Sequence, residues 1–483
     1  MRRFENDVQV IKYEVLKEVA KQAMEGNLEE KYDTIPEKIS PGPKPRTRCC
    51  VYKERAIIEE RVKIARGGDR NNKNNIEIIS IACDECSINR YTVTEACRGC
   101  LAKWCHEACP VSAIYYVGNR AYIDTKKCIE CGKCKNVCPY NAISDVMRPC
   151  RRACDAKALY IDKDKKAVID NGKCVQCGAC VYKCPFGAIM DKSYIVDVIE
   201  QLKNSKKNST KVYAVVAPAI SSQFTHVKIG QLTRGIKLLG FHDVVEAALG
   251  ADVIAYHETV EFAKEIDEKQ LITSSCCPAF VKHIKNSYPE LEEKISSAVS
   301  PMIAVSKLIK RMDKDAKIVF IGPCTAKKME INEDDIRGWT DYVITFEELT
   351  SMIDAAEINL EECIEDPLDN ASFYGRIFAR TGGLTEAIKH VIEEEKLDTE
   401  FRSISCDGLA ECDKALKMAK VSRLKENFIE GMACKGGCIG GAASVHHGPK
   451  DRNEVDKYGK LAIEKKIKDS LRVIKLDDLD LNR

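Results

Sequence analysis

The chain has 483 residues, and 45% of them are hydrophobic, which is enough apolar material for roughly two or three cores. Its 76 Lys and Arg residues nearly balance its 74 Asp and Glu residues, so charge favours neither nucleic acid nor a membrane surface as a partner. We find no apolar run of ~18 residues and no signal peptide, and therefore expect a cytoplasmic protein with no membrane span. The 26 Cys then indicate metal sites, because disulfides are disfavoured in a reducing compartment.

Three polar stretches suggest boundaries along the chain. A Pro-rich connector covers 40–45, a Gly- and Asn-rich stretch covers 66–75, and a third break covers 204–210. The segments expected from these breaks are 1–75, 76–203 and 204–483.

The first segment is charged and small. Its apolar residues recur at three- and four-residue spacing around 8–23 and 52–64, which predicts two helices. Cys49 and Cys50 have no ligand-like partners nearby. We assign this helical segment no function beyond docking or dimerisation.

The second segment carries two complete copies of the bacterial ferredoxin run, Cys-x2-Cys-x2-Cys-x3-Cys-Pro. The first copy is Cys128, Cys131, Cys134 and Cys138, and the second is Cys174, Cys177, Cys180 and Cys184. In such runs the first three Cys hold one 4Fe-4S cluster and the fourth ligates the other. We therefore predict two clusters, with Cys184 completing the first set of three and Cys138 the second.

Eight further Cys lie in the same segment. Cys97, Cys100, Cys105 and Cys109 form a third ferredoxin-like run, and the remaining four are Cys83, Cys86, Cys150 and Cys154. Four clusters with four ligands each would use all sixteen Cys of an α+β ferredoxin-like domain. The alternative is a structural zinc site of Cys83, Cys86, Cys97 and Cys100, because paired Cys-x2-Cys doublets are also typical of zinc. Cys150 and Cys154 fit either scheme.

The third segment alternates short apolar runs with helical patterns, which predicts an α/β fold. The expected strands are 212–217, 271–273, 317–321, 342–345 and 403–405. Two of these runs lead into Cys motifs, Cys276-Cys277-Pro278 and Pro323-Cys324, and a third motif spans Met432–Gly441 and contains Cys434 and Cys438. The carboxyl end of a strand is where α/β sheets place ligands, and soft thiolates select iron-sulfur, zinc or Cu(I).

Together, and in this order, the three motifs resemble the signature of the FeFe (iron-only) hydrogenases, which reads Cys-Cys-Pro, Pro-Cys-x2-Lys-x2-Glu and Met-Ala-Cys-x-Gly-Gly-Cys. The resemblance covers roughly residues 211–483. It implies two α/β lobes with an H-cluster in the cleft between them. This cofactor is a 4Fe-4S cubane joined through a Cys sulfur to a two-iron unit with CO, cyanide and dithiolate ligands. By motif position the cubane ligands are Cys277, Cys324, Cys434 and Cys438, with Cys438 bridging.

The resemblance also implies a proton relay. Cys276 is left over from the ligand set and would face the bridging amine and pass protons. Glu258 and Glu261 would continue the relay, with Ser296 between Cys276 and Glu258. Without the resemblance, these two acids would read as a solvated helix face. The outermost Arg of the family has no counterpart, because Glu265 stands at its position.

Several residues would surround the two-iron unit in this scheme. Lys327 would donate to one cyanide and Glu330 would hold the loop, whereas Ala217, Pro218 and Ala219 would contact the other cyanide. Met432, which opens the third motif, is counted with these cofactor-binding residues. Gly322 and Phe280 replace the Met and Trp of the best-known members, which places the chain in a divergent, group B-like subgroup.

The function expected is therefore that of an anaerobic, cytoplasmic hydrogenase. It would interconvert H2 with protons and electrons and pass electrons through its 4Fe-4S clusters to ferredoxin or another soluble carrier. The partners expected are these carriers, hydrogenase maturation enzymes and a second copy of the chain in a homodimer. The alternatives are a nonenzymatic Nar-like iron-sulfur assembly factor and a hydrogen sensor. Cys276, Lys327 and the Met432–Gly441 loop speak against the assembly factor.

Overall fold

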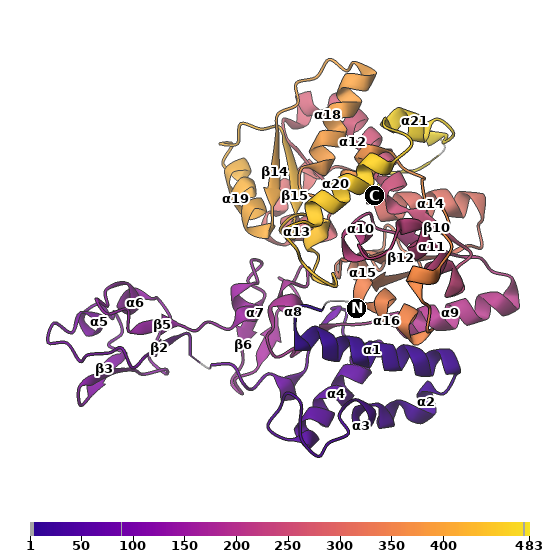
Figure 1. The fold of residues 1–483 in the computed structure, drawn as a ribbon. Helices are drawn as coiled ribbons and strands as arrows, with labels where there is room; N and C mark the ends of the chain where they lie inside the picture. Colours follow the sequence, from indigo (N-terminus) through magenta and orange to yellow (C-terminus); the bar gives the residue numbers. More distant parts are fainter. Residues whose placement is uncertain (1–3, 88, 477–478) are drawn as a thin grey trace.

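The computed structural model describes residues 4–87, 89–476 and 479–483 (Figure 1). Among these residues, no helix has the length and apolar character needed to cross a membrane. A helical amino-terminal segment and a Cys-rich part precede two parallel sheets along the chain.

The amino-terminal segment forms four helices, which confirms the two expected around 8–23 and 52–64. They are α1 (Asp7–Glu25), α2 (Leu28–Lys31), α3 (Ile35–Ile39) and α4 (Val51–Ala65). The Asn6 side chain accepts a hydrogen bond from the Gln9 N–H at the start of α1, and Gly26 ends the helix in a left-handed conformation. Helix α1 packs its buried face against α16 (Phe346–Ala355), so this segment lies against the third one (Figure 1).

The Cys-rich part forms two ferredoxin-like modules, one inserted into the other. The near module contains β1 (Ile76–Ile78) paired with β8 (Ile189–Asp191), the hairpin of β6 (Leu159–Ile161) and β7 (Ala167–Ile169), α7 (Pro149–Arg152) and α8 (Ala179–Lys183). The far module contains β2 (Tyr91–Val93) paired with β5 (Ile143–Asp145), the hairpin of β3 (Ile114–Val117) and β4 (Arg120–Ile123), α5 (Trp104–Glu107) and α6 (Lys133–Asn136). Figure 1 shows the far module projecting from the rest of the molecule.

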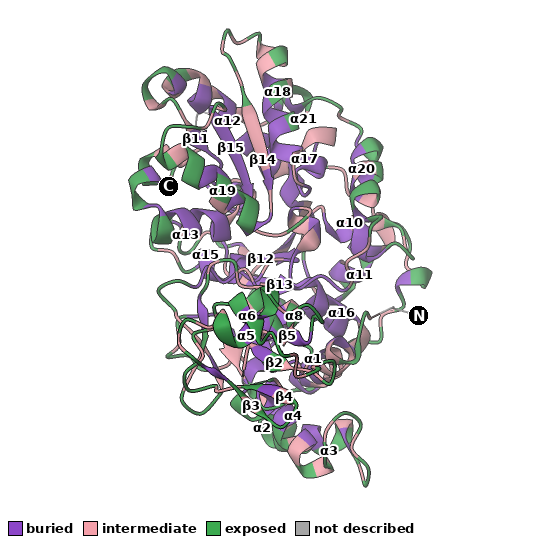
Figure 2. Cartoon of the chain, turned by 90° about the vertical axis from the view of Figure 1, so that its left-hand side faces the viewer, coloured by how far each residue is buried: buried purple, intermediate pink, exposed green. Residues whose placement is uncertain are grey.

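The first large sheet has four parallel strands in the order β10-β9-β12-β13. These are β9 (Val212–Val216), β10 (Asp243–Glu246), β12 (Lys317–Gly322) and β13 (Tyr342–Thr345). Its associated helices are α9 (Ile195–Asn208), α10 (Ile220–Gln223), α11 (Ile229–Leu238), α14 (Pro301–Met312), α15 (Lys327–Glu330) and α16. The central strands are buried along nearly their whole length, as is usual for a parallel sheet covered on both faces (Figure 2).

The second sheet has three parallel strands in the order β11-β15-β14. These are β11 (Ile272–Thr273), β14 (Ser403–Asp407) and β15 (Phe428–Met432). The helices of this half are α12 (Ala247–Lys269), α13 (Pro278–Ser287), α17 (Phe373–Ile377), α18 (Gly383–Glu395), α19 (Leu409–Lys420), α20 (Asp451–Leu461) and α21 (Ile467–Leu471). The α/β architecture predicted for this segment is therefore confirmed.

Three features differ from the sequence prediction. Strands β10 and β15 were not predicted. The expected break at 204–210 is wrong in part, because α9 continues to Asn208. Val198, Ile199 and Leu202 are buried on one face of α9, so packing carries the helix into the polar stretch.

Candidate active site and iron-sulfur ligands

The loops that carry the predicted site residues leave the carboxyl ends of strands from both sheets. Cys324 follows β12 of the first sheet, Cys276 and Cys277 follow β11 of the second, and the Cys434–Cys438 loop follows β15. The loops after β12 and β15 touch, because the Ala443 N–H donates to the Pro323 carbonyl at 3.1 Å. The carboxyl edges of the two sheets thus supply one common site.

The thiols of Cys277, Cys324, Cys434 and Cys438 face one another at this site. Burial, followed by the neighbouring Cys324 and Cys277 thiols, raises the pKa of Cys438 to about 12. Burial and then Cys277 raise the pKa of Cys324 to about 11, and burial followed by Cys324 raises that of Cys434 well above its usual value. Buried thiolates this close repel each other unless cations lie between them. Four converging, half-buried Cys are the donor set that a 4Fe-4S cubane requires.

Cys276 lies beside this group. Its side chain is buried, and burial followed by the nearby Glu258 carboxylate raises the pKa of its thiol well above the usual value. The thiols of Cys277 and Cys438 also contribute to this shift. Cys276 is therefore a protonated thiol between the four-thiol group and a buried carboxyl.

Glu258 and Glu261 both project from α12 into the protein. Oε1 of Glu258 accepts hydrogen bonds from Ser275 N–H at 3.3 Å and Ser275 Oγ at 3.1 Å, while its Oε2 has no hydrogen-bond donor within the described part of the chain. Burial, followed by Glu261, raises the pKa of Glu258 to about 8. Ser296 Oγ donates to Glu261 Oε2 at 2.5 Å. The predicted place of Ser296 between Cys276 and Glu258 is wrong, since it lies at the two carboxyls, further from the thiol.

Lys327 and Glu330 form a buried ion pair on α15. Lys327 Nζ donates to Glu330 Oε2 at 2.6 Å and to the Cys276 carbonyl at 3.4 Å, which brings the ammonium to the Cys276 side of the site. Arg483 Nη2 donates to the other Glu330 oxygen at 2.6 Å. Ala217 continues from β9 with its N–H bonded to the Ile321 carbonyl, and Pro218 and Ala219 lead into α10 on the same sheet edge.

Two carboxylates near the site were not predicted from the sequence. Glu430 lies within β15, is fully buried and contributes to raising the pKa values of Cys276 and Cys438. Asp407 accepts a hydrogen bond from the Gly436 N–H at 2.5 Å and so holds the loop between Cys434 and Cys438. Asp407 could have been found from its place at the end of an expected strand.

The near module brings together two groups of four Cys. Burial, followed by the Cys184, Cys83 and Cys86 thiols, raises the pKa of Cys150 to about 11. The second group consists of Cys154, Cys174, Cys177 and Cys180, which line one small enclosed space.

The far module brings together the other two groups. Burial, followed by the thiols of Cys128, Cys131 and Cys109, raises the pKa of Cys134 to about 11. The last group, Cys97, Cys100, Cys105 and Cys138, lines a second enclosed space. All sixteen Cys of the region therefore fall into four groups of four.

This grouping corrects the predicted pairing of the ferredoxin runs. Cys184 lies with Cys83, Cys86 and Cys150, and Cys138 lies with Cys97, Cys100 and Cys105. The prediction is wrong because each clean run is paired with a less regular run of its own module. The four Cys of the alternative zinc site do not come together, since its two doublets belong to different modules.

Within the part of the chain that the structure describes, no group of three or more His, Cys, Asp or Glu side chains is suited to a single metal ion.

The near module touches the active site through its Cys174–Cys184 run. Thr325 Oγ1 donates to the Gln176 carbonyl at 2.7 Å, and a Cβ on Gly178 would lie 2.7 Å from both Thr325 Oγ1 and Ala442 Cβ. Cys177 and Cys434 line the same cavity of about 580 Å³. Glycine at position 178 thus permits close contact between the near module and the active-site loops.

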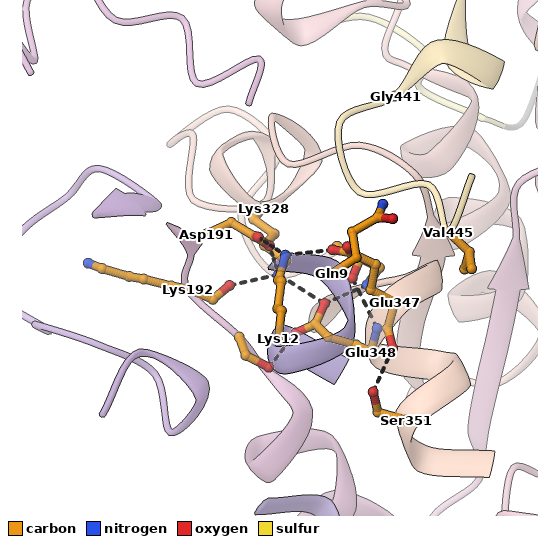
Figure 3. Close-up of polar contacts among 12 residues, drawn as sticks. Gln9, Lys12, Asp191, Lys192, Lys328, Glu347, Glu348, Ser351, Gly441 and Val445 are labelled. Carbon is orange, nitrogen blue, oxygen red and sulfur yellow. Dashed lines mark hydrogen bonds and ion pairs between the residues drawn. The ribbon is translucent and has the colours of Figure 1, made fainter. Parts of the chain in front are cut away.

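A buried charge cluster joins Lys12 and Lys328 to three carboxylates (Figure 3). Lys12 Nζ of α1 donates to Asp191 at 2.7 Å and Glu347 at 2.5 Å. Lys328 Nζ of α15 donates to Asp191 at 2.8 Å and Glu348 at 2.9 Å. These contacts tie the amino-terminal segment, the near module and the first sheet together one residue away from Lys327.

Comparisons with known proteins agree with this site. Residues 210–442 match the family model of the iron only hydrogenase large subunit, C-terminal domain, and residues 121–144 and 167–190 match that of the 4Fe-4S binding domain. Iron hydrogenase 1 of Clostridium pasteurianum is 31% identical over 403 residues, which cover 72% of this chain and 69% of that relative. This chain belongs to the iron-only hydrogenase family.

Two further comparisons support the assignment. The periplasmic Fe hydrogenase large subunit of Nitratidesulfovibrio vulgaris is 30% identical over 381 residues, 68% of this chain and 86% of the relative. A solved FeFe-hydrogenase structure, from work on oxygen inactivation of the H cluster, aligns with a TM-score of 0.51 and 21% identity over 60% of this chain and 95% of that one. The chain is therefore an FeFe hydrogenase with 4Fe-4S sites, and its catalytic part has the FeFe-hydrogenase fold.

Proposed function

We propose that this FeFe hydrogenase interconverts H2 with protons and electrons at an H-cluster whose cubane is held by Cys277, Cys324, Cys434 and Cys438. When bound, the H-cluster supplies the redox chemistry, and the chain supplies ligands, a proton route and an electron route. The observation that carries the proposal is the position of Cys276. It is a buried thiol that borders the four-thiol group on one side and Glu258 on the other.

Proton movement is the part that the side chains perform directly. A carboxyl with a pKa of about 8 can hold and release a proton near neutral pH, and the protonated Cys276 thiol beside it can donate a proton and take one up again. A proton can pass from Cys276 to Glu258 and then, by way of Ser296, to Glu261. Glu261 also accepts a hydrogen bond from the N–H of Ser297, a partly exposed residue, so the route leads outward.

Lys327 and its partners would position the two-iron unit. A buried ammonium suits an anionic cyanide, and the Glu330 carboxylate fixes the direction of the lysine. The loop of Ala217, Pro218 and Ala219 would face the other cyanide, and Met432 would close the pocket at the end of β15.

Electrons would travel through four 4Fe-4S clusters in the two modules. One cluster would be next to the H-cluster, namely that of Cys154, Cys174, Cys177 and Cys180. The Cys177 thiol is close enough to Cys434 to contribute to raising its pKa. The two clusters of the far module would lie towards the outer end of the chain of clusters.

The outer end of the far module is suited to a soluble carrier. Leu101 is 99% exposed and Trp104 is 55% exposed beside Cys100 and Cys105. Lys103, Lys133 and Lys135 are also exposed, and none of them has an ion-pair partner among the residues described. An apolar centre with a cationic rim is complementary to a small acidic electron carrier such as ferredoxin.

The proposal is tested by infrared spectroscopy of the full chain matured with hydrogenase assembly enzymes, together with H2 production from reduced methyl viologen. Bands of CO and cyanide with H2 production are expected. A matured chain with 4Fe-4S signals but neither bands nor H2 production would instead match the Nar-like assembly factor. H2-dependent signalling without turnover would match the sensor.

A further inference from the structure

The proposed relay needs an outlet beyond Glu261. Glu265, four residues further along α12, is engaged by Lys269 Nζ at 2.6 Å. It therefore lies in an ion pair directed along the helix and away from Glu261. The opposite direction along the same helix face leads to His257, four residues before Glu261.

His257 is linked to Glu261 through a second segment. Oε1 of Glu261 accepts a hydrogen bond from the Ser297 N–H at 2.8 Å. Ser297 Oγ donates to Asn482 Oδ1 at 2.9 Å, and Nε2 of His257 lies 3.1 Å from the same oxygen. Because Oδ1 only accepts, Nε2 carries a hydrogen in this contact, and Nδ1 of the neutral ring is left as the proton acceptor.

Residues 481–483 hold this arrangement in place. They lie antiparallel to 297–299, with the Val299 N–H bonded to the Leu481 carbonyl and the Arg483 N–H bonded to the Ser297 carbonyl, each at 2.8 Å. The Arg483 guanidinium is directed to Glu330 and Glu333, away from His257. Asp480 accepts from the Asn482 N–H. The titratable groups of this patch are thus His257, Glu261, Asp480 and Arg483.

We infer that His257 is the surface end of the proton relay and that Asn482 is the positioning residue that holds its ring. The inference rests on the proposed function, because it extends the Cys276 to Glu261 route. In the outward direction the proton that leaves Glu261 is taken up by Nδ1 of neutral His257, and the imidazolium then gives a proton to bulk water. The steps run in reverse when protons are consumed, and no electrons are exchanged in either direction. Asn482 carries no proton, since its Oδ1 accepts from both neighbours.

The test uses full-length, matured enzyme and measures isotope exchange between H2 and D2O in the absence of an electron carrier. Exchange needs proton movement but no long-range electron transfer, so it isolates the relay. His257→Gln keeps an amide that can bond to Asn482 but cannot carry a proton. We expect its exchange rate to fall by at least ~10-fold in dilute buffer, and added imidazole to restore much of it. His242→Gln, at an exposed histidine beside Tyr213, is the matched control and should exchange at the wild-type rate.

Two further measurements separate the possible causes. Asn482→Ala should lower exchange by a smaller factor and respond to imidazole in the same way. Treatment of the full chain with diethyl pyrocarbonate, followed by peptide mass spectrometry, should modify His257 and His242 but spare the buried His283. A His257 as unreactive as His283 would overturn the inference, because a surface port must be open to solvent.

Wild-type exchange in His257→Gln would also overturn it. If Cys276→Ala nonetheless blocks exchange, the relay of the proposed function stands and its outlet lies elsewhere. If neither change slows exchange, the relay itself fails. Absence of the infrared bands of CO and cyanide identifies any variant that has lost its H-cluster. For such a variant, the inference is judged by the reactivity of His257 with diethyl pyrocarbonate and by the exchange rate of Asn482→Ala.

Discussion

The carboxyl of Glu258 is enclosed by its own helix and by the segment after β11. Its hydrogen bonds from Ser275 fall on one oxygen, while the other oxygen is buried without a partner among the residues described. Burial therefore dominates, and it raises the pKa of Glu258 to about 8. A group in this condition is suited to exchanging protons near neutral pH.

At this scale, we predict that Glu258→Gln lowers H2 production by at least ~10²-fold, because an amide cannot carry the proton. The assay is turnover of the matured enzyme with reduced methyl viologen. Glu268→Gln, at an exposed position on the same helix, is the control and should retain wild-type turnover. Equal turnover in both variants would remove Glu258 from the relay.

The sequence predicted Cys276, Glu258 and Glu261 only through the family resemblance, since by itself an acidic helix reads as solvated. Glu430 was missed for a physical reason. Its strand, Phe428–Met432, contains a charged residue and a glycine, so it does not read as a buried strand. The carboxylate is tolerated because Gly382 N–H and Thr385 at the start of α18 donate to it.

Among the elements, the strands leading to Cys277 and Cys324 were predictable because they are short apolar runs ending at turn residues. The pairing of the Cys runs was not, because it depends on one module being inserted into the other. Residues 76–86 belong to the near module, where β1 pairs with β8, and the chain comes back to this module only at Cys150. The spacing of Cys within each run does not reveal this return.

The far module's small helices α5 and α6 yield a prediction about the electron carrier. Leu101→Ser should raise KM for an acidic bacterial ferredoxin by about 3–10-fold and leave turnover with methyl viologen unchanged, because an exposed apolar contact is worth about 1 kcal/mol or slightly more. Leu461→Ser, at a 73% exposed leucine on α20, is the control. A ferredoxin KM insensitive to Leu101 would place the carrier elsewhere. Loss of a stable dimer in Leu101→Ser would assign the surface to a second copy of the chain.

The four groups of Cys lead to a prediction about iron content. The full chain, purified without the enzymes that build the two-iron unit, should hold five cubanes and so about twenty iron with no zinc. About twelve iron with one zinc would contradict the four-cluster arrangement. Cys184→Ala should disturb the same paramagnetic signal as Cys83→Ala, and Cys128→Ala a different one.

For the whole molecule, the buried charges of Figure 3 couple three parts of the chain that the sequence presents as separate segments. Lys12 and Lys328 share Asp191, and each also binds a glutamate of α16. The first segment therefore belongs to the structural base of the active site, a role that its composition does not reveal.

We predict that Lys328→Met lowers the free energy of unfolding by about 3–5 kcal/mol, because Asp191 and Glu348 lose a buried partner. Lys21→Met, at an exposed pair with Glu357 3.7 Å away, should cost less than about 1 kcal/mol. Denaturant unfolding of the apo chain compares the two. Similar small losses would show that the buried cluster contributes little to holding the parts together.

The central claim is that adjacent thiols have different tasks, with Cys277 as a cubane ligand and Cys276 as a proton carrier. Infrared spectra and turnover of matured Cys277→Ala and Cys276→Ala test it most directly. Cys277→Ala should lack the CO and cyanide bands, because the cubane loses a ligand. Cys276→Ala should keep the bands while turnover falls by at least ~10²-fold, and Cys276→Asp should recover part of it. A Cys276→Ala enzyme with normal bands and near-wild-type turnover would contradict the account.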